Sequence, residues 1–138
     1  LDEVSGIGLL TASALKTAVG KPERFASGRH LSAWLGMTPN EYSSGERRRL
    51  GCISCKGNTY VRTLLIHGAR AALLAAKRCQ TRTPERLTQL QRWALQTAER
   101  IGHNKAAVAL ANKLVRICWA VWCHERRFSG DWQSARPA

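Results

Sequence analysis

The feature that most limits the fold of this chain is a broadly apolar helix predicted over residues 104–126. Its apolar positions spread well beyond one stripe of an α-helix, and they comprise Val108, Leu110, Ala111, Leu114, Val115, Ile117, Cys118, Trp119, Val121 and Trp122. A helix with so wide an apolar surface is not stable alone in water. Much of it must therefore be buried, either by the rest of this chain or by another domain.

Apolar periodicity and helix start and stop signals predict further helices up to Gly20 and over residues 28–36, 58–77 and 84–101. Residues 37–57 form a long irregular loop between helical segments. A loop of this length in a compact domain is commonly functional or contains a small hairpin, and its expected strand is 50–53. The predicted fold class is a small all-α domain, with room for one short β element in that loop.

The charge of the chain favours a polyanion as its partner. In 138 residues there are 22 Lys+Arg against 9 Asp+Glu, which gives a formal net charge of +13. Nucleic acid is the first candidate partner, because a basic domain is the electrostatic counterpart of a phosphate backbone. A membrane is the second, but no uninterrupted apolar run reaches the roughly 20 residues that span a bilayer, so we expect no membrane association and a cytoplasmic location.

A turn with two glycines opens the chain, at Ser5-Gly6-Ile7-Gly8, and an Ala/Leu-rich helix follows it. This is the pattern of a helix-hairpin-helix, in which Gly6 and Gly8 would let the turn approach a DNA backbone. Amides at the following helix N-terminus would then face a phosphate. The alternative is an ordinary interhelical turn. The DNA interpretation predicts recognition of backbone shape without reading of base sequence.

The segment Ser43-Ser44-Gly45-Glu46 leads directly into Arg47-Arg48-Arg49. A serine hydroxyl is a weak nucleophile at neutral pH, so attack on a phosphodiester requires a proton acceptor and cations that stabilise charge on phosphorus. The three arginines are candidates for those cations. Ser, Gly, Glu and Arg are also ordinary turn residues, so a solvated connector is the alternative.

Other chemistry finds less support in the sequence. Cys52 and Cys55 have the spacing of half a zinc site, but Cys118 and Cys123 lie five apart on a predicted helix and their side chains diverge. The odd number of cysteines argues for reduced thiols rather than a disulfide framework. The histidines are dispersed and the acidic residues form no cluster suited to Mg²⁺. We predict no metal site in this chain.

Seven short blocks, read in order, resemble the C-terminal transposase domain of the IS one-ten class of insertion-sequence transposases, a bacterial family. They begin at Ser5, Phe25, Ala33, Ser43, Leu50, Tyr60 and Asn104. The longest blocks are Tyr60-Val61-Arg62-Thr63-Leu64-Leu65-Ile66-His67-Gly68-Ala69-Arg70 and Asn104-Lys105-Ala106-Ala107-Val108-Ala109-Leu110-Ala111-Asn112-Lys113-Leu114. The resemblance covers about residues 4–122. It implies a transposase domain over 1–128, and the residues that follow, 129–138, are predicted to form a loose tail.

The resemblance also implies a chemistry. A serine in the Ser-Gly segment is the family's nucleophile, and Ser44 is the best match, with Ser43 as the alternative. Arg49, Lys56 and Arg62 match basic positions that flank it and are implied phosphate contacts. Mg²⁺ would be held by acidic residues of a preceding RNase H-like domain, which is absent from this chain, so the isolated fragment is expected to be inactive.

Further partners follow from the same resemblance: DNA, a guide RNA encoded by the element, and other copies of the protein in a homo-oligomer at the bacterial nucleoid. This chain departs from the family pattern at Cys55, where a lysine usually follows Ile-Ser. Lys56 could replace that cation, since lysine acts as a mobile point charge. The alternative function is a nucleic-acid-binding or oligomerisation module without catalytic activity.

Overall fold

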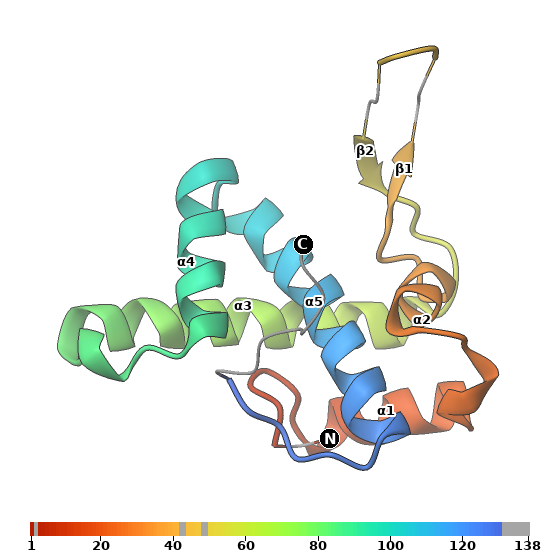
Figure 1. Ribbon diagram of the computed structural model, residues 1–138, viewed down its shortest axis with the longest axis horizontal. Helices are drawn as coiled ribbons and strands as arrows, with labels where there is room; N and C mark the ends of the chain where they lie inside the picture. The colour runs from red at the N-terminus through yellow and green to blue at the C-terminus, as the bar shows by residue number, and fades with distance from the viewer. Residues whose placement is uncertain (2, 42–43, 48–49, 131–138) are drawn as a thin grey trace.

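The computed structural model describes residues 1, 3–41, 44–47 and 50–130, and within it the chain forms a helical domain with one projecting β-hairpin (Figure 1). The α-helices are α1 (Leu9–Val19), α2 (Gly28–Trp34), α3 (Thr59–Arg82), α4 (Gln89–Ile101) and α5 (His103–Cys123). Two short 3₁₀ turns, η1 (Pro22–Arg24) and η2 (Pro84–Arg86), precede α2 and α4. The strands are β1 (Pro39–Glu41) and β2 (Leu50–Ile53). The predicted fold class, a small and mainly helical domain, is confirmed.

Helix α5 lies at the centre of the domain and packs against α2, α3 and α4 (Figure 1). Its buried residues are Ala106, Ala107, Leu110, Ala111, Leu114, Val115 and Cys118. The indole N–H of Trp119 also donates a hydrogen bond to the carbonyl of Pro22 in η1, at 3.0 Å. The broad apolar surface predicted for this helix is therefore largely covered by the chain itself. Length and composition alone would also allow α5 to cross a membrane, a test that core helices commonly pass.

Local signals fix the ends of α3 and α4. The Asn58 side chain accepts a hydrogen bond from the amide of Val61 at 3.1 Å, which caps α3 at the predicted start of this helix. Helix α3 then continues to Arg82, beyond the predicted end near residue 77, because no glycine or proline interrupts the chain before Pro84. Helix α4 begins at Gln89 rather than near Pro84, since the proline starts a 3₁₀ turn and Thr88 supplies a capping box.

The turn before α1 packs directly against the middle of α3 through a pair of glycines. A Cβ atom on Gly68 would lie 1.9 Å from the carbonyl oxygen of Gly6, and one on Gly6 would lie 2.8 Å from that of Gly68. Gly6 also has a φ of +88°, a conformation that favours glycine. The two glycines thus allow backbone-to-backbone contact, and Val4 and Ile7 on either side are buried in the core.

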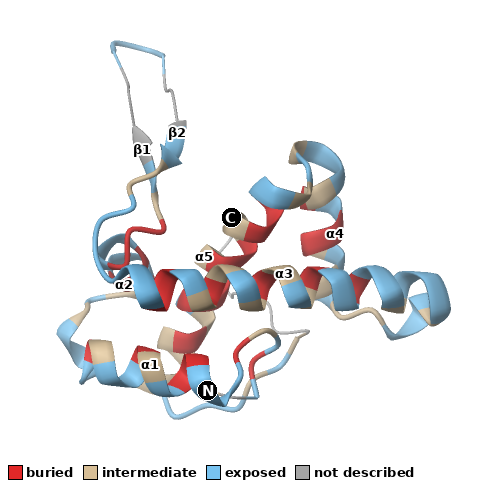
Figure 2. Cartoon of the chain, turned by 180° about the vertical axis from the view of Figure 1, so that it is seen from behind, coloured by how far each residue is buried: buried red, intermediate tan, exposed pale blue. Residues whose placement is uncertain are grey.

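The β-hairpin stands away from the helices and begins beside the end of α2 (Figure 1). Its strands are antiparallel, with Pro39 opposite Ile53 and Glu41 opposite Leu50. Burial is concentrated in the helical body below it, where α1, α3, α4 and α5 turn their apolar faces toward one another (Figure 2). At the other end of the chain, the amide of Leu90 donates to the carbonyl of Gly130 at 3.0 Å, so the predicted tail is tied to α4 where it starts.

Candidate functional site

The tip of the hairpin carries Ser44. The amide of Ser44 donates to the carbonyl of Arg47 at 3.3 Å, and the amide of Arg47 donates to the carbonyl of Ser44 at 3.2 Å. Gly45, at the first central position, has a φ of +59°, as a tight hairpin turn of type II′ requires. Residues 44–47 are all exposed. The Ser-Gly pair therefore forms a projecting turn that an extended molecule can reach.

The base of the hairpin is held by two close backbone approaches. A Cβ on Gly36 would lie 2.0 Å from the carbonyl oxygen of Lys56, and a Cβ on Gly57 would lie 2.3 Å from that of Trp34. Both glycines have positive φ, +76° and +97°. In addition, the amide of Cys55 donates to the carbonyl of Gly36 at 3.2 Å. The two ends of the hairpin can lie this close together only because neither glycine carries a side chain.

Arg62 forms hydrogen bonds to both ends of the hairpin base. It lies on the first turn of α3 and is only 8% exposed. Its Nη1 donates to the carbonyls of Leu35 and Lys56, both at 3.3 Å, and its Nη2 donates to the hydroxyl of Thr59 at 3.4 Å. Arg62 was predicted as a phosphate contact directed toward the serine loop. The structure instead directs its guanidinium to the base of that loop, which favours a role in positioning the hairpin.

Asn112 of α5 makes a second connection to this region. Its Oδ1 accepts a hydrogen bond from the buried hydroxyl of Ser32 at 2.7 Å, and its Nδ2 donates to the carbonyl of Met37 at 3.3 Å. Met37, which is buried, directly precedes the residues that lead into β1. Sequence reasoning did not single out Asn112, because the residues it bonds are about 80 positions away. The central helix and Arg62 thus fix the orientation of the hairpin base together.

The other predicted contacts fall into three groups. Gly8 is exposed and open to solvent at the N-cap of α1, whereas Gly6 is used in packing against α3. Lys56 and Arg47 are exposed and accessible to a ligand. Ser43, Arg48 and Arg49 lie outside the described residues.

A cluster of cations that sequence reasoning missed lies where α2 meets α5. Gly28 packs on the backbone of Arg116, where a Cβ would lie 2.9 Å from the Arg116 Cα. Burial lowers the pKa of Arg116, and the charge of Arg29 on α2 lowers it further. Burial and the neighbouring Arg116 likewise lower the pKa of Lys113. The neighbouring charges that lower these two pKa values are thus cations. An anionic ligand bound beside them would reduce the repulsion between these positive charges.

The cysteines behave as free thiols. All five are unpaired with one another, and Cys52 and Cys55 are exposed near the hairpin base. Cys118 is buried in the core, and burial raises the pKa of its thiol to about 12. Within the described part of the chain, His, Cys, Asp and Glu side chains form no group of three that could hold a metal ion.

Comparison with known proteins identifies the class to which this domain belongs. A "Probable family 20 transposase" of Pseudomonas aeruginosa is 45% identical over 88% of the chain, which covers 34% of that protein. The "Transposase for insertion sequence element IS1111A" of Coxiella burnetii is 38% identical over 93% of the chain and 33% of its own length. The corresponding protein of element IS1328 from Yersinia enterocolitica is 35% identical over 91% of the chain and 36% of its length. The chain is thus similar to transposases of insertion sequences.

The family is defined more closely by a family model. The chain belongs to the Transposase IS116/IS110/IS902 family, whose model matches residues 1–86. That match includes the Gly-Ile-Gly turn, the serine hairpin and all of α3. The chain spans about a third of the length of the relatives compared above.

Proposed function

We propose that this domain binds DNA and supplies the nucleophile for strand cleavage and exchange in transposition of an insertion sequence, as one part of a longer transposase. Membership of the transposase family supports the general role. The observation that carries the finer assignment is the placement of Ser44 at an exposed hairpin tip whose base is fixed by Arg62, Gly36 and Gly57. A fixed base with an exposed tip orients a reacting group without burying it.

In the proposed reaction, the Ser44 hydroxyl oxygen attacks a DNA phosphorus. The new bond joins this oxygen to phosphorus, and the bond from phosphorus to the leaving sugar oxygen breaks. The serine proton passes to a base or to solvent, and the leaving oxygen is protonated in turn. Arg47, exposed beside Ser44 in the same turn, is the candidate to stabilise charge on that phosphate, whereas Lys56, exposed at the hairpin base, is a candidate contact for another phosphate of the bound DNA. The metal ligands implied by the resemblance would come from other parts of the longer protein.

A direct test is a search for the covalent intermediate in the full-length transposase. The protein is incubated with its guide RNA, Mg²⁺ and cognate DNA, and the digested peptide of residues 43 and 44 is analysed by mass spectrometry. A nucleotide attached to Ser44 is expected. An adduct on Ser43 would move the nucleophile by one residue, and no adduct in an actively recombining reaction would contradict the proposal.

Substitution separates catalysis from binding. Ser44→Ala in the full-length protein is expected to lower the strand-cleavage rate by about 10³-fold or more and to leave DNA affinity unchanged, because the hydroxyl acts only in the chemical step. Ser54→Ala, at the hairpin base, is the matched control and should retain cleavage. Unchanged cleavage in Ser44→Ala would favour the alternative function, a binding module without catalysis.

A further inference from the structure

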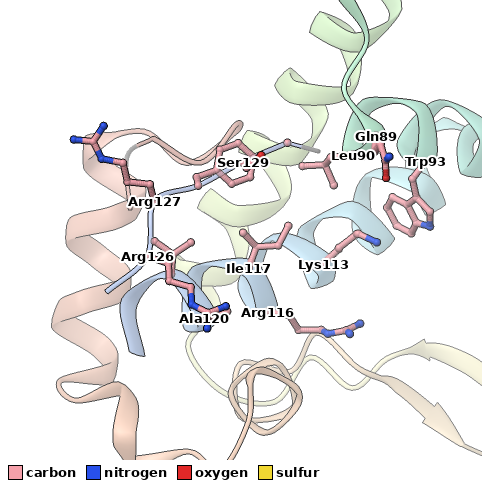
Figure 3. A pocket seen from close by; sticks show the side chains of 13 residues that line it. Gln89, Leu90, Trp93, Lys113, Arg116, Ile117, Ala120, Arg126, Arg127 and Ser129 are labelled. Carbon is pink, nitrogen blue, oxygen red and sulfur yellow. The ribbon is translucent and has the colours of Figure 1, made fainter. Parts of the chain in front are cut away.

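The structure contains a pocket, distant in sequence from the serine hairpin, that the proposed reaction does not use. It has a volume of about 390 Å³ and lies between α4, α5 and the segment that follows α5 (Figure 3). Its apolar lining comes from Leu90, Ile117, Ala120, Val121 and Phe128. This volume falls within the range of pockets that bind small organic groups, and a nucleobase with its sugar is of that size.

One aromatic ring and several cations border this pocket. Trp93 of α4 contributes its indole ring, and the Lys113 ammonium lies 4.3 Å from the ring centroid. Lys113 points toward that ring in Figure 3, whereas Arg127 points away from the pocket. Arg116 lies one turn beyond Lys113 on the same face of α5. Among the described residues that line the pocket, none is acidic.

This combination resembles the general arrangement by which proteins hold single-stranded nucleic acid. Unpaired bases stack on aromatic rings, and a basic groove follows the backbone. A duplex keeps its bases stacked on one another, so it offers no free base face to Trp93. Burial and neighbouring cations lower the pKa values of Lys113 and Arg116, and a phosphate placed beside them would offset both effects.

We propose that the pocket between α4 and α5 binds an unpaired nucleotide of single-stranded DNA or RNA, with the base against Trp93 and the adjoining phosphates at Lys113 and Arg116. The base replaces the Lys113 ammonium over the ring, and this side chain then contacts phosphate. Arg29, whose charge acts on Arg116, extends the basic surface from the pocket toward α2. The inference rests on the proposed function, because it assigns a nucleic-acid strand to a second site on the same domain.

The test measures the affinity of the chain for a fluorescent oligothymidylate of about ten nucleotides, for the matching oligouridylate, and for a blunt DNA duplex. Trp93→Leu is expected to weaken binding of the single strands by roughly 5- to 100-fold, the effect of losing one base–aromatic stack, with duplex affinity little changed. Trp93→Phe should restore part of the loss. Comparison of the two single strands distinguishes DNA from RNA as the preferred ligand.

Charge variants make the test independent of Trp93, which also packs against the core. Lys113→Gln should weaken single-strand binding. It should also reduce the slope of log affinity against log salt concentration by about 0.7, the contribution of one phosphate contact. Arg78→Gln removes the same charge from an exposed site on α3, which does not line the pocket, and should have a smaller effect. Thermal unfolding of each variant confirms that it is folded.

Three outcomes would overturn the inference. If Trp93→Leu and Lys113→Gln are both folded and bind the single strands as tightly as the unaltered chain, the pocket is not the single-strand binding site. Duplex binding that is retained in that case leaves the proposed function intact. If the unaltered chain binds no nucleic acid, the DNA-binding proposal fails as well. If the chain forms dimers that Trp93→Leu dissociates and binds no oligonucleotide, the occupant is an apolar segment of a second copy.

Discussion

Replacing Arg62 with methionine is expected to loosen the hairpin base and destabilise the whole domain. The guanidinium donates hydrogen bonds to the carbonyls of Leu35 and Lys56, the residues that flank the hairpin on either side. The Leu35 contact is buried, whereas the Lys56 contact is only partly so, and water can replace part of the second bond. Since each buried group left unpaired costs about 1–3 kcal/mol, the expected loss in the free energy of unfolding is about 2–4 kcal/mol.

Such a loss is measurable, because domains of this size unfold with about 5–15 kcal/mol. Urea denaturation gives the change in the free energy of unfolding, and amide hydrogen exchange at Ser54 and Cys55 reports on the hairpin base. Arg78→Met is the matched control, since Arg78 is exposed on the same helix and its loss should cost less than about 0.5 kcal/mol. Arg62→Lys should fall between the two, because an ammonium lacks the planar fork of the guanidinium.

The reasoning would be refuted if Arg62→Met lost no more stability than Arg78→Met. It would also be refuted if the domain were destabilised while exchange at Ser54 and Cys55 changed no more than elsewhere, because the lost contacts would then not be those of the hairpin base. In the full-length transposase, the same variant should reduce strand cleavage more than DNA affinity, since it displaces the serine hairpin and leaves the exposed cations in place.

Three further outcomes follow from the packing. Gly68→Ala should cost about 1–3 kcal/mol or more in urea denaturation, because its Cβ would meet the Gly6 carbonyl. Gly8→Ala, whose Cβ meets nothing within 4 Å, should cost less, about 1 kcal/mol, because alanine is a poorer N-cap of α1 than glycine. Asn112→Ala should lower the free energy of unfolding by about 1–3 kcal/mol through loss of its two hydrogen bonds, and an unchanged melting temperature would count against that role. At pH 8 a thiol reagent should label the exposed cysteines of the folded chain but label Cys118 only after unfolding, because Cys118 is buried and its pKa is raised to about 12. Rapid labelling of Cys118 in the native state would contradict the described core.

Local sequence signals determined the elements correctly where neighbouring residues control them. The start of the helix at residues 58 and 59, the strand at 50–53 and the helical character of the segments all depend on contacts within a few positions. The start of α4 was placed too early, because Pro84 begins a 3₁₀ turn that lies outside the helix. The breadth of the apolar surface on α5 correctly predicted burial, and the structure assigned that burial to α2, α3 and α4.

The candidate site was predictable in part. The Ser-Gly segment and its basic surroundings were visible in the sequence, because turn residues and charges are local features. The role of Arg62 was not predictable from the sequence. Whether its guanidinium is free for a phosphate or bonds to backbone carbonyls depends on how close Leu35 and Lys56 lie in the folded chain. The pocket at Trp93 and Lys113 was missed for the same reason, because each residue alone resembles an ordinary helix position.

The sequence by itself therefore determined the helical class of the domain, its strong positive charge and its resemblance to a transposase family, because periodicity, composition and ordered motifs are properties of the chain read in one dimension. Only the tertiary structure decided which charges line a pocket and which support the fold. The distinction rests on burial and hydrogen-bond partners: Arg62 is enclosed by backbone carbonyls, whereas Lys113 and Arg116 lie beside a pocket with cations as their charged neighbours.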